Sequence, residues 1–250
     1  MSFQFEKVGR SITLIEKAYS ALLKVIGETS PNHNKLPSEE DIACMLGVSR
    51  TTIREALNQL VSEGLISKVP GKGYYAHRSV HDLKNRIDLY PDFYKLLTCY
   101  YREAVLTIAN IEKRSASPKT EIEFKKNDIK IREVYAMRWI YSANGTRMFV
   151  GDLEFPVEYI VKPFRDLNHI KGLSDFSDQY MRFPITHCTM TLDICTCVES
   201  SQALGLGDQI KPALCWFESI YNINDEIIGC GRYFINPDSM KLSINAAILK

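Results

Sequence analysis

The sequence predicts an α+β protein with two domains. Residues 1–76 show helical periodicity followed by two short extended runs, whereas short β-rich runs with helices between them dominate beyond residue 89. The chain has 250 residues, of which 45% are hydrophobic and 24% are charged. This length suits one large or two small hydrophobic cores, and the composition excludes a disordered or fibrous protein.

Charge and hydropathy exclude further classes. Residues 1–86 carry 12 basic and 9 acidic side chains, an asymmetry too slight to indicate a nucleic-acid partner without a favourable placement on one face. No stretch approaches the roughly 20 apolar residues of a membrane helix, and the charged N-terminus lacks the apolar core of a secretory signal. We therefore expect a cytoplasmic protein with no membrane partner.

The cysteine pattern is unlike that of a disulfide scaffold. Seven cysteines are scattered over a long chain, and their number is odd. We expect them to be reduced and mostly buried. They are Cys44, Cys99, Cys188, Cys195, Cys197, Cys215 and Cys230.

Three helices are expected in the first domain. The first spans residues 12–26, where apolar side chains recur at helical spacing. The second begins after Ser38, whose hydroxyl can cap it while Asp41 reaches back, and it ends at Gly47. Ser49 can cap the third helix. The apolar positions of this helix are Ile53, Ala56, Leu57, Leu60 and Val61.

The opposite face of the third helix has groups suited to reading DNA. Arg50, Arg54 and Asn58 follow one another at intervals of four, with Thr51 beside them. Arginine pairs with guanine and asparagine with adenine in the major groove, and hydroxyls near a helix N-terminus suit phosphates. An ordinary solvated face is the alternative for an isolated helix, but the preceding helix and turn favour a recognition helix.

A hairpin follows the third helix. Residues 65–69 and 74–76 are short extended runs separated by Pro70, Gly71, Lys72 and Gly73. Lys72 at the tip could enter a minor groove or contact phosphates. A hairpin directly after a helix-turn-helix predicts a winged helix-turn-helix domain, which we place at residues 1–78.

The run from Leu36 to Ile66, followed by Gly71-Lys-Gly-Tyr-Tyr, closely resembles the DNA-binding domain of GntR-family bacterial transcription regulators. The resemblance implies a homodimer that binds double-stranded DNA at a palindromic operator, with one winged helix on each half-site. The family usually has an arginine where this sequence has Glu40. By motif position, the DNA-facing residues are Ser38, Ser49, Arg50, Thr51, Thr52, Arg54, Lys72 and Gly73.

A second domain is expected after a polar linker at residues 79–88. Residues 89–250 form this domain, with a mixed, largely antiparallel sheet. Its expected strands include residues 134–141, 185–198, 213–222, 227–234 and 241–248. Its expected helices are residues 91–97, 120–126, 174–181 and 199–204.

Within the GntR family, this second domain resembles the HutC-like branch, whose ligand domain, UTRA, is similar to the chorismate lyase fold. The matching features are Arg138 before Asn144-Gly145, Pro156 after an extended run, Ala203-Leu-Gly-Leu, and Tyr221 to Asp225 leading to Arg232-Tyr-Phe. Ile140 and Gly151 stand where that branch commonly has arginine and glutamate. The resemblance implies a small-molecule effector, such as an anionic sugar phosphate or a carboxylate.

Five residues are candidates for holding the effector. Single arginines on expected strands could bind an anion, although surface salt bridges are an equal alternative. A serine before the helix at 174–181 could hold an anion with the helix N-terminal amides, or could simply cap the helix. A glutamate and a tyrosine could orient a polar ligand, and the tyrosine could equally belong to the core. These candidates are Arg138, Ser174, Glu218, Arg232 and Tyr233.

No cofactor or metal is expected. Cys195 and Cys197 would share one face of a strand, but this pair lacks the second pair of ligands that a structural zinc site requires.

The leading hypothesis is a transcription regulator, acting as a repressor, that responds to an effector bound in the second domain. In one alternative, the second domain serves only for dimerisation. In another, the protein is a lyase-like enzyme that uses Arg138, Glu218 and Arg232 on a carboxylated substrate. The sequence has no nucleophile–base motif, phosphate loop or telling carboxylate pair, so we expect no enzymatic activity.

Overall fold

The computed structural model describes residues 13–89, 92–207 and 210–246. The chain divides into two compact units. One comprises the described residues up to Lys84 together with residues 243–246, and the other extends from Asn85 to Leu242. The segment expected to be a linker contains part of a short helix, α4 (Arg78–His81), and the buried residues Asn85 and Arg86.

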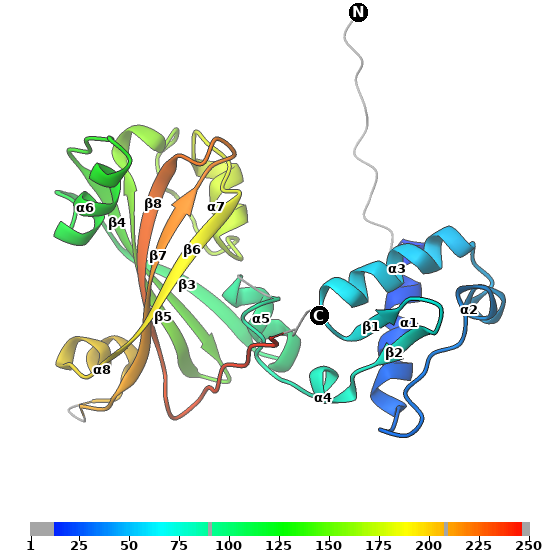
Figure 1. The fold of residues 1–250 in the computed structure, drawn as a ribbon. Coiled ribbons are helices and arrows are strands. Elements are labelled where there is room, and N and C mark those ends of the chain that lie inside the picture. Colours follow the sequence, from blue (N-terminus) through cyan, green and yellow to red (C-terminus); the bar gives the residue numbers. More distant parts are fainter. Residues whose placement is uncertain (1–12, 90–91, 208–209, 247–250) are drawn as a thin grey trace, which may run out of the picture. The chain divides into compact units, whose positions relative to one another are not determined.

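The first unit is a three-helix domain with a two-stranded antiparallel hairpin (Figure 1). Its core is formed by apolar side chains from all three helices and from both strands. Helix α3 contributes four fully buried residues, which leaves its other face to solvent. The elements besides α4 are α1 (Leu14–Glu28), α2 (Glu39–Leu46), α3 (Arg50–Ser62), β1 (Ile66–Val69) and β2 (Gly73–Ala76).

The second unit is built on a six-stranded sheet in the order β3-β4-β5-β8-β7-β6 (Figure 1). Every strand pair in this order is antiparallel, so the expectation of an antiparallel sheet in an α+β fold is confirmed. The strands are β3 (Ala104–Arg114), β4 (Val134–Ala143), β5 (Thr146–Pro156), β6 (His187–Cys195), β7 (Ala213–Tyr221) and β8 (Ile227–Ile235).

Helices cover both faces of this sheet (Figure 1). Phe93 of α5 and Phe176 of α7 pack into the core on one face. On the other face, Phe124 of α6 and Leu204 of α8 pack against the sheet in two smaller clusters. The helices are α5 (Phe93–Tyr100), α6 (Pro118–Lys126), α7 (Leu173–Tyr180) and α8 (Val198–Leu204), with a short 3-10 turn at Val157–Tyr159. No helix within the described ranges is long and apolar enough to cross a membrane.

Most expected elements are present, with a few differences. The N-terminal helix begins at Leu14, and Ile12 lies outside the described residues. Pro91 also lies outside them, and α5 begins at Phe93. The expected strand at 241–248 is wrong for residues 241–246, which form no strand, and its last two residues are not described. The sequence prediction did not include β3, and it gave β5 only as an extended run before Pro156.

The cysteine expectation is half right. All seven thiols are free, but only Cys215 and Cys230 are buried, while Cys44 and Cys99 are exposed. The prediction of mostly buried cysteines is therefore wrong.

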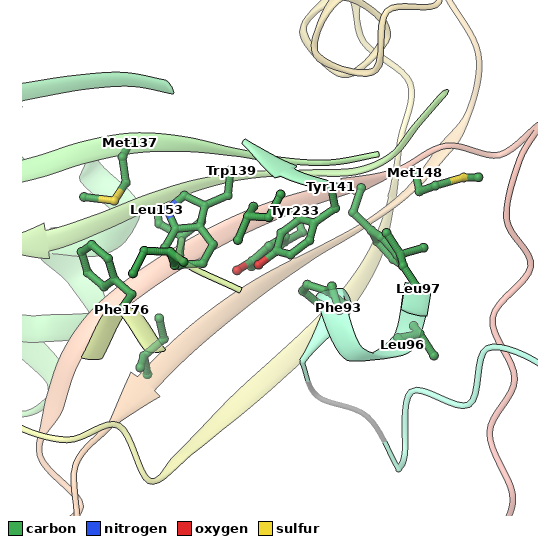
Figure 2. Close-up of a cluster of buried hydrophobic side chains, with 14 of the residues drawn as sticks. Phe93, Leu96, Leu97, Met137, Trp139, Tyr141, Met148, Leu153, Phe176 and Tyr233 are labelled. Carbon is green, nitrogen blue, oxygen red and sulfur yellow. The ribbon is translucent and has the colours of Figure 1, made fainter. Parts of the chain in front are cut away.

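The main core of the second unit is rich in aromatic side chains (Figure 2). Trp139, Tyr141 and Tyr233 extend from the sheet toward α5 and α7, and all three are buried. The ring of Phe93 stacks on Phe149 with their centroids 4.8 Å apart. Rings of this size account for much of the apolar area that stabilises such a core.

A carboxyl group is buried within the same layer. Glu218 on β7 is fully buried, and neither of its carboxylate oxygens has a hydrogen-bond partner among the described residues. Burial raises the pKa of Glu218 to about 7, against a smaller opposite effect of Cys188 and Tyr233 beside it. The folded protein therefore holds a proton on Glu218 under conditions where the unfolded chain has released it.

The stability of the second unit should fall between pH 5 and pH 8 because of Glu218. Between about pH 4.5 and pH 7, Glu218 is protonated in the folded state but ionised in the unfolded chain, because folding raises its pKa from 4.5 to about 7. The stability gained is thus largest at low pH and is lost as pH rises through 7. Replacing Glu218→Gln should remove about 3 kcal/mol of this pH dependence, because the pKa rises from 4.5 to about 7 on folding and one pKa unit corresponds to ~1.4 kcal/mol.

Urea unfolding followed by tryptophan fluorescence at pH 5, 6, 7 and 8 measures this effect, since both tryptophans of the chain, Trp139 and Trp216, lie in this core. The matched control is Asp178→Asn, which alters an exposed carboxylate on α7. An unchanged pH dependence in Glu218→Gln would contradict the account of Glu218.

Candidate nucleic-acid interface and effector sites

The turn between α2 and α3 is fixed by caps at both helix N-termini. The Ser38 hydroxyl accepts a hydrogen bond from the Asp41 amide at 3.1 Å, and the Asp41 carboxylate accepts one from the Ser38 amide at 3.3 Å. Gly47 ends α2 with a φ of 64°, a conformation that glycine adopts without strain. Ser49 then caps α3 by accepting from the Thr52 amide at 3.1 Å. The expected capping box, turn and cap are all confirmed.

Helix α3 presents its polar residues on one exposed face. Arg50, Thr51, Arg54 and Asn58 are exposed, and Thr52 is half-buried. The opposite stripe is fully buried against the core, so the helix cannot rotate without exposing apolar surface. The exposed face therefore has the donors needed to contact base edges and phosphates.

Glu39 on α2 connects α3 to the hairpin. Its Oε2 accepts hydrogen bonds from Arg54 Nε at 3.1 Å and Nη2 at 2.9 Å. Its Oε1 accepts from the Tyr74 hydroxyl at 2.9 Å. The hydrogen bonds from Arg54 lower the pKa of Glu39, and the Arg54 pKa is raised in return. Glu39 thus holds the Arg54 guanidinium in a defined orientation.

Glu40 lies near the other arginine of the face. Arg50 Nη1 lies 3.8 Å from Glu40 Oε2, and both side chains are mostly exposed. An exposed pair at this distance contributes little to stability.

The hairpin places lysines around its tip. Lys72 is exposed between Gly71 and Gly73, whose φ values of 72° and 102° form the turn. Lys68 lies over the ring of Tyr74, with Nζ 5.3 Å from the centroid. Sequence reasoning missed Lys68, Glu39 and Tyr74, although Glu39 lies within the quoted motif. The sequence does not display the pairing of β1 with β2, which places Lys68 opposite Tyr74.

The sheet divides the expected effector residues between its two faces. Arg138, Asp152 and Arg232 occupy one row across β4, β5 and β8, so their side chains share a face. Glu218 and Tyr233 occupy the neighbouring rows and extend from the opposite face into the aromatic core. The five candidates therefore do not form one site, and a lyase-like site that combines Arg138, Glu218 and Arg232 is excluded by this geometry.

The arginine face bears an open cavity of about 790 Å³. Arg138 donates from Nε and Nη2 to the two oxygens of Asp152 at 2.6 and 2.8 Å, and Arg232 pairs with Glu199 at 3.1 Å. The basic lining residues are Arg114, Lys119, Arg138 and Arg232, and the acidic ones are Glu112, Asp152, Glu154, Asp193 and Glu199. The bonds to Asp152 and Glu199 use only part of the donors of Arg138 and Arg232, so an anion would compete with these carboxylates for the arginines.

Ser174 does not precede its helix as expected. It is the second residue of α7, and Gly172 is the N-cap. The Ser174 side chain is exposed and forms no cap, while the adjacent Asp175 places a carboxylate in the same first turn. A like charge at this end disfavours an anion.

Cys195 and Cys197 do not share a strand face. Strand β6 ends at Cys195, and Cys197 is the N-cap of α8. Hydrogen bonding with Ser200 lowers the pKa of the Cys197 thiol. Within the described ranges, no three His, Cys, Asp or Glu side chains are grouped as a metal site.

Comparison with known proteins matches residues 14–75 to the family model of bacterial regulatory proteins, gntR family. The transcriptional repressor NagR of Bacillus subtilis is 42% identical over 52 residues, which cover 21% of each chain. The histidine utilization repressor of Pseudomonas aeruginosa is 37% identical over 65 residues, or 23% of this chain and 26% of the relative. The matched stretch spans about a quarter or less of the length of these relatives.

Two solved structures extend the fold comparison to the rest of the chain. The possible transcriptional regulator YydK of B. subtilis is similar over 94% of this chain and all of its own, with a TM-score of 0.70 and 16% identity. PhnF from Mycobacterium smegmatis is similar over 92% of this chain and 99% of its own, with a TM-score of 0.52 and 15% identity. Residues 14–75 therefore match the gntR family of bacterial regulatory proteins in sequence, and the two solved structures share the fold of most of the chain.

Proposed function

We propose that this protein is a sequence-specific DNA-binding transcription regulator that acts as a repressor and responds to a small molecule bound in its second unit. The observation that carries this proposal is the exposed face of α3, where Arg50 and Arg54 lie opposite a fully buried apolar stripe. The names of the relatives support the direction of regulation, since NagR and the histidine utilization repressor are both repressors.

The DNA contacts follow from the placement of the side chains. In this proposal, α3 enters the major groove and Arg54 and Arg50 contact base edges or phosphates. Ser38, Ser49, Thr51 and Thr52 lie near the N-termini of α2 and α3, where exposed hydroxyls and amides suit backbone phosphates. Lys72 and Gly73 contact the adjacent minor groove or backbone through the hairpin.

A homodimer on a palindromic operator completes the proposal. One recognition helix contacts only a few base pairs. Two identical subunits related by two-fold symmetry contact two half-sites, so the DNA sequence that is read is twice as long. The effector acts by binding more tightly to one of two dimer states, which changes the affinity for DNA.

Replacing Arg54→Ala should weaken binding to the operator by about tenfold to a hundredfold, because a well-formed arginine–guanine contact contributes ~1–3 kcal/mol. The operator is first selected from a random pool of duplexes by the purified protein, and affinity is then measured by fluorescence anisotropy. The control is Arg165→Ala, which removes the same charge from an exposed position in the second unit. Equal losses in both variants, or no loss in Arg54→Ala, would contradict a base-reading role.

Replacing Lys72→Ala should weaken binding to the selected operator and to unrelated duplexes to a similar extent, because a phosphate contact carries little sequence information. The slope of log affinity against log salt should decrease by about one phosphate contact. Anisotropy titrations at four salt concentrations measure this slope. A loss confined to the selected operator would show instead that Lys72 reads sequence.

A further inference from the structure

The face of the sheet beneath α5 and α7 contains buried polar atoms without partners. Among the described residues, no hydrogen bond of normal geometry reaches either oxygen of Glu218, Nε1 of Trp139 or Trp216, or the hydroxyl of Tyr233, although Cys188 and Tyr233 lie beside Glu218. All four residues are buried, and an unpaired polar group in such a place is costly. Their grouping in one core indicates a polar species that binds there.

The strand register makes these groups neighbours. Trp139, Gly151, Tyr233 and Trp216 form one row across β4, β5, β8 and β7. Glu218 lies two residues beyond Trp216 on the same face. A Cβ at Gly151 would lie 2.3 Å from the Tyr233 ring, so the glycine leaves room for that ring over β5.

The environment of Glu218 lacks a cation. No salt bridge in the described part of the chain includes Glu218, and the groups that affect its ionisation are Cys188 and Tyr233. Another carboxylate, Asp92, lies at the start of α5, where it accepts from the Tyr94 and Lys95 amides. Aromatic faces attract cations through their quadrupoles, most strongly where water is excluded. A carboxylate among indole and phenol rings is therefore suited to a positively charged group.

Phe93 fills the space among these rings. Its centroid is 4.9 Å from those of Trp216 and Tyr233, and 5.5 Å from that of Tyr141. Figure 2 shows Phe93 beneath Tyr141 and Tyr233. The ring comes from the first residue of an eight-residue helix and not from the sheet. Withdrawing the ring would require a shift of α5, whose Leu96 and Leu97 are buried in the same core, and such a shift would leave a space of the size of the ring beside the sheet.

We propose that the space held by the Phe93 ring is the binding site of a small, flat organic cation, whose charged nitrogen pairs with Glu218 and whose ring replaces that of Phe93. The inference rests on the proposed function, because it defines the chemical class of the effector. It differs from the anionic effector expected from the sequence. A natural ligand of this class would also carry an acceptor atom for an indole N–H of Trp139 or Trp216, which the simple probe used below lacks.

The site offers a route from ligand to DNA. Phe93 belongs to the first helix of the second unit, and the chain leads from that helix back to the winged helix through residues 85–89. A ligand that expels the Phe93 ring favours a displaced α5, and DNA binding changes to the extent that the two states of α5 differ in operator affinity.

Tryptophan fluorescence tests the site directly, because both tryptophans of the chain lie in it. The full-length protein is titrated at pH 8 with phenethylammonium, with neutral 2-phenylethanol and with anionic 3-phenylpropanoate. We expect a saturable change with phenethylammonium and at least about tenfold weaker binding of the other two probes. Equal binding of the neutral probe, or no saturable response to the ammonium, would overturn the proposal.

Two variants identify the residues responsible. Glu218→Gln should weaken phenethylammonium binding by about tenfold or more and leave 2-phenylethanol binding unchanged, whereas the control Asp152→Asn on the opposite face should alter neither affinity.

Phe93→Ala should bind phenethylammonium more tightly than the native protein because the competing ring is absent. If Phe93→Ala does not fold by circular dichroism, Glu218→Gln decides the matter. Operator binding is measured on the same protein to separate this inference from the proposed function. If the protein binds the operator but no cation, the inference about the effector is refuted and the DNA-binding proposal stands.

Discussion

The burial of one face of each element decides which polar residues of this protein meet. In α3, the stripe of Ile53, Ala56, Leu57 and Leu60 is fully buried, and this fixes the direction in which Arg50 and Arg54 extend. In the sheet, alternation along each strand places Arg138 with Asp152 on one face and Glu218 on the other. The burial of apolar surface therefore decides which polar side chains lie together in both candidate sites, and polar contacts contribute little to that choice.

The charges on the proposed DNA-binding surface are arranged in pairs. Glu39 holds Arg54 through two hydrogen bonds and accepts a third from Tyr74, so the side chain is oriented before DNA arrives. Such orientation reduces the entropy lost on binding and favours contacts with a defined geometry. The looser pair of Glu40 and Arg50 lacks this constraint. We infer that Arg54 contributes more to sequence recognition than Arg50, and that Arg50 adapts to the backbone.

The first unit could be predicted closely from sequence because its signals are local. Ser38, Gly47 and Ser49 define helix ends within a few residues, and the period of α3 defines its exposed face. In the second unit, element types were largely predictable, but the site was not. Arg138 and Tyr233 seemed equivalent as strand residues, and only the register across β4, β5 and β8 shows that they lie on opposite faces. Strand order and register depend on long-range pairing, which a single sequence does not display.

Hydrogen–deuterium exchange with and without the selected operator tests the DNA-binding account most directly, because it locates the contact surface without any substitution. The account predicts slower exchange at the N-terminus of α3, residues 50–54, and at the hairpin tip, residues 71–73, with little direct change in α6 of the second unit. Protection that avoids α3 and the hairpin while the operator is bound would contradict it.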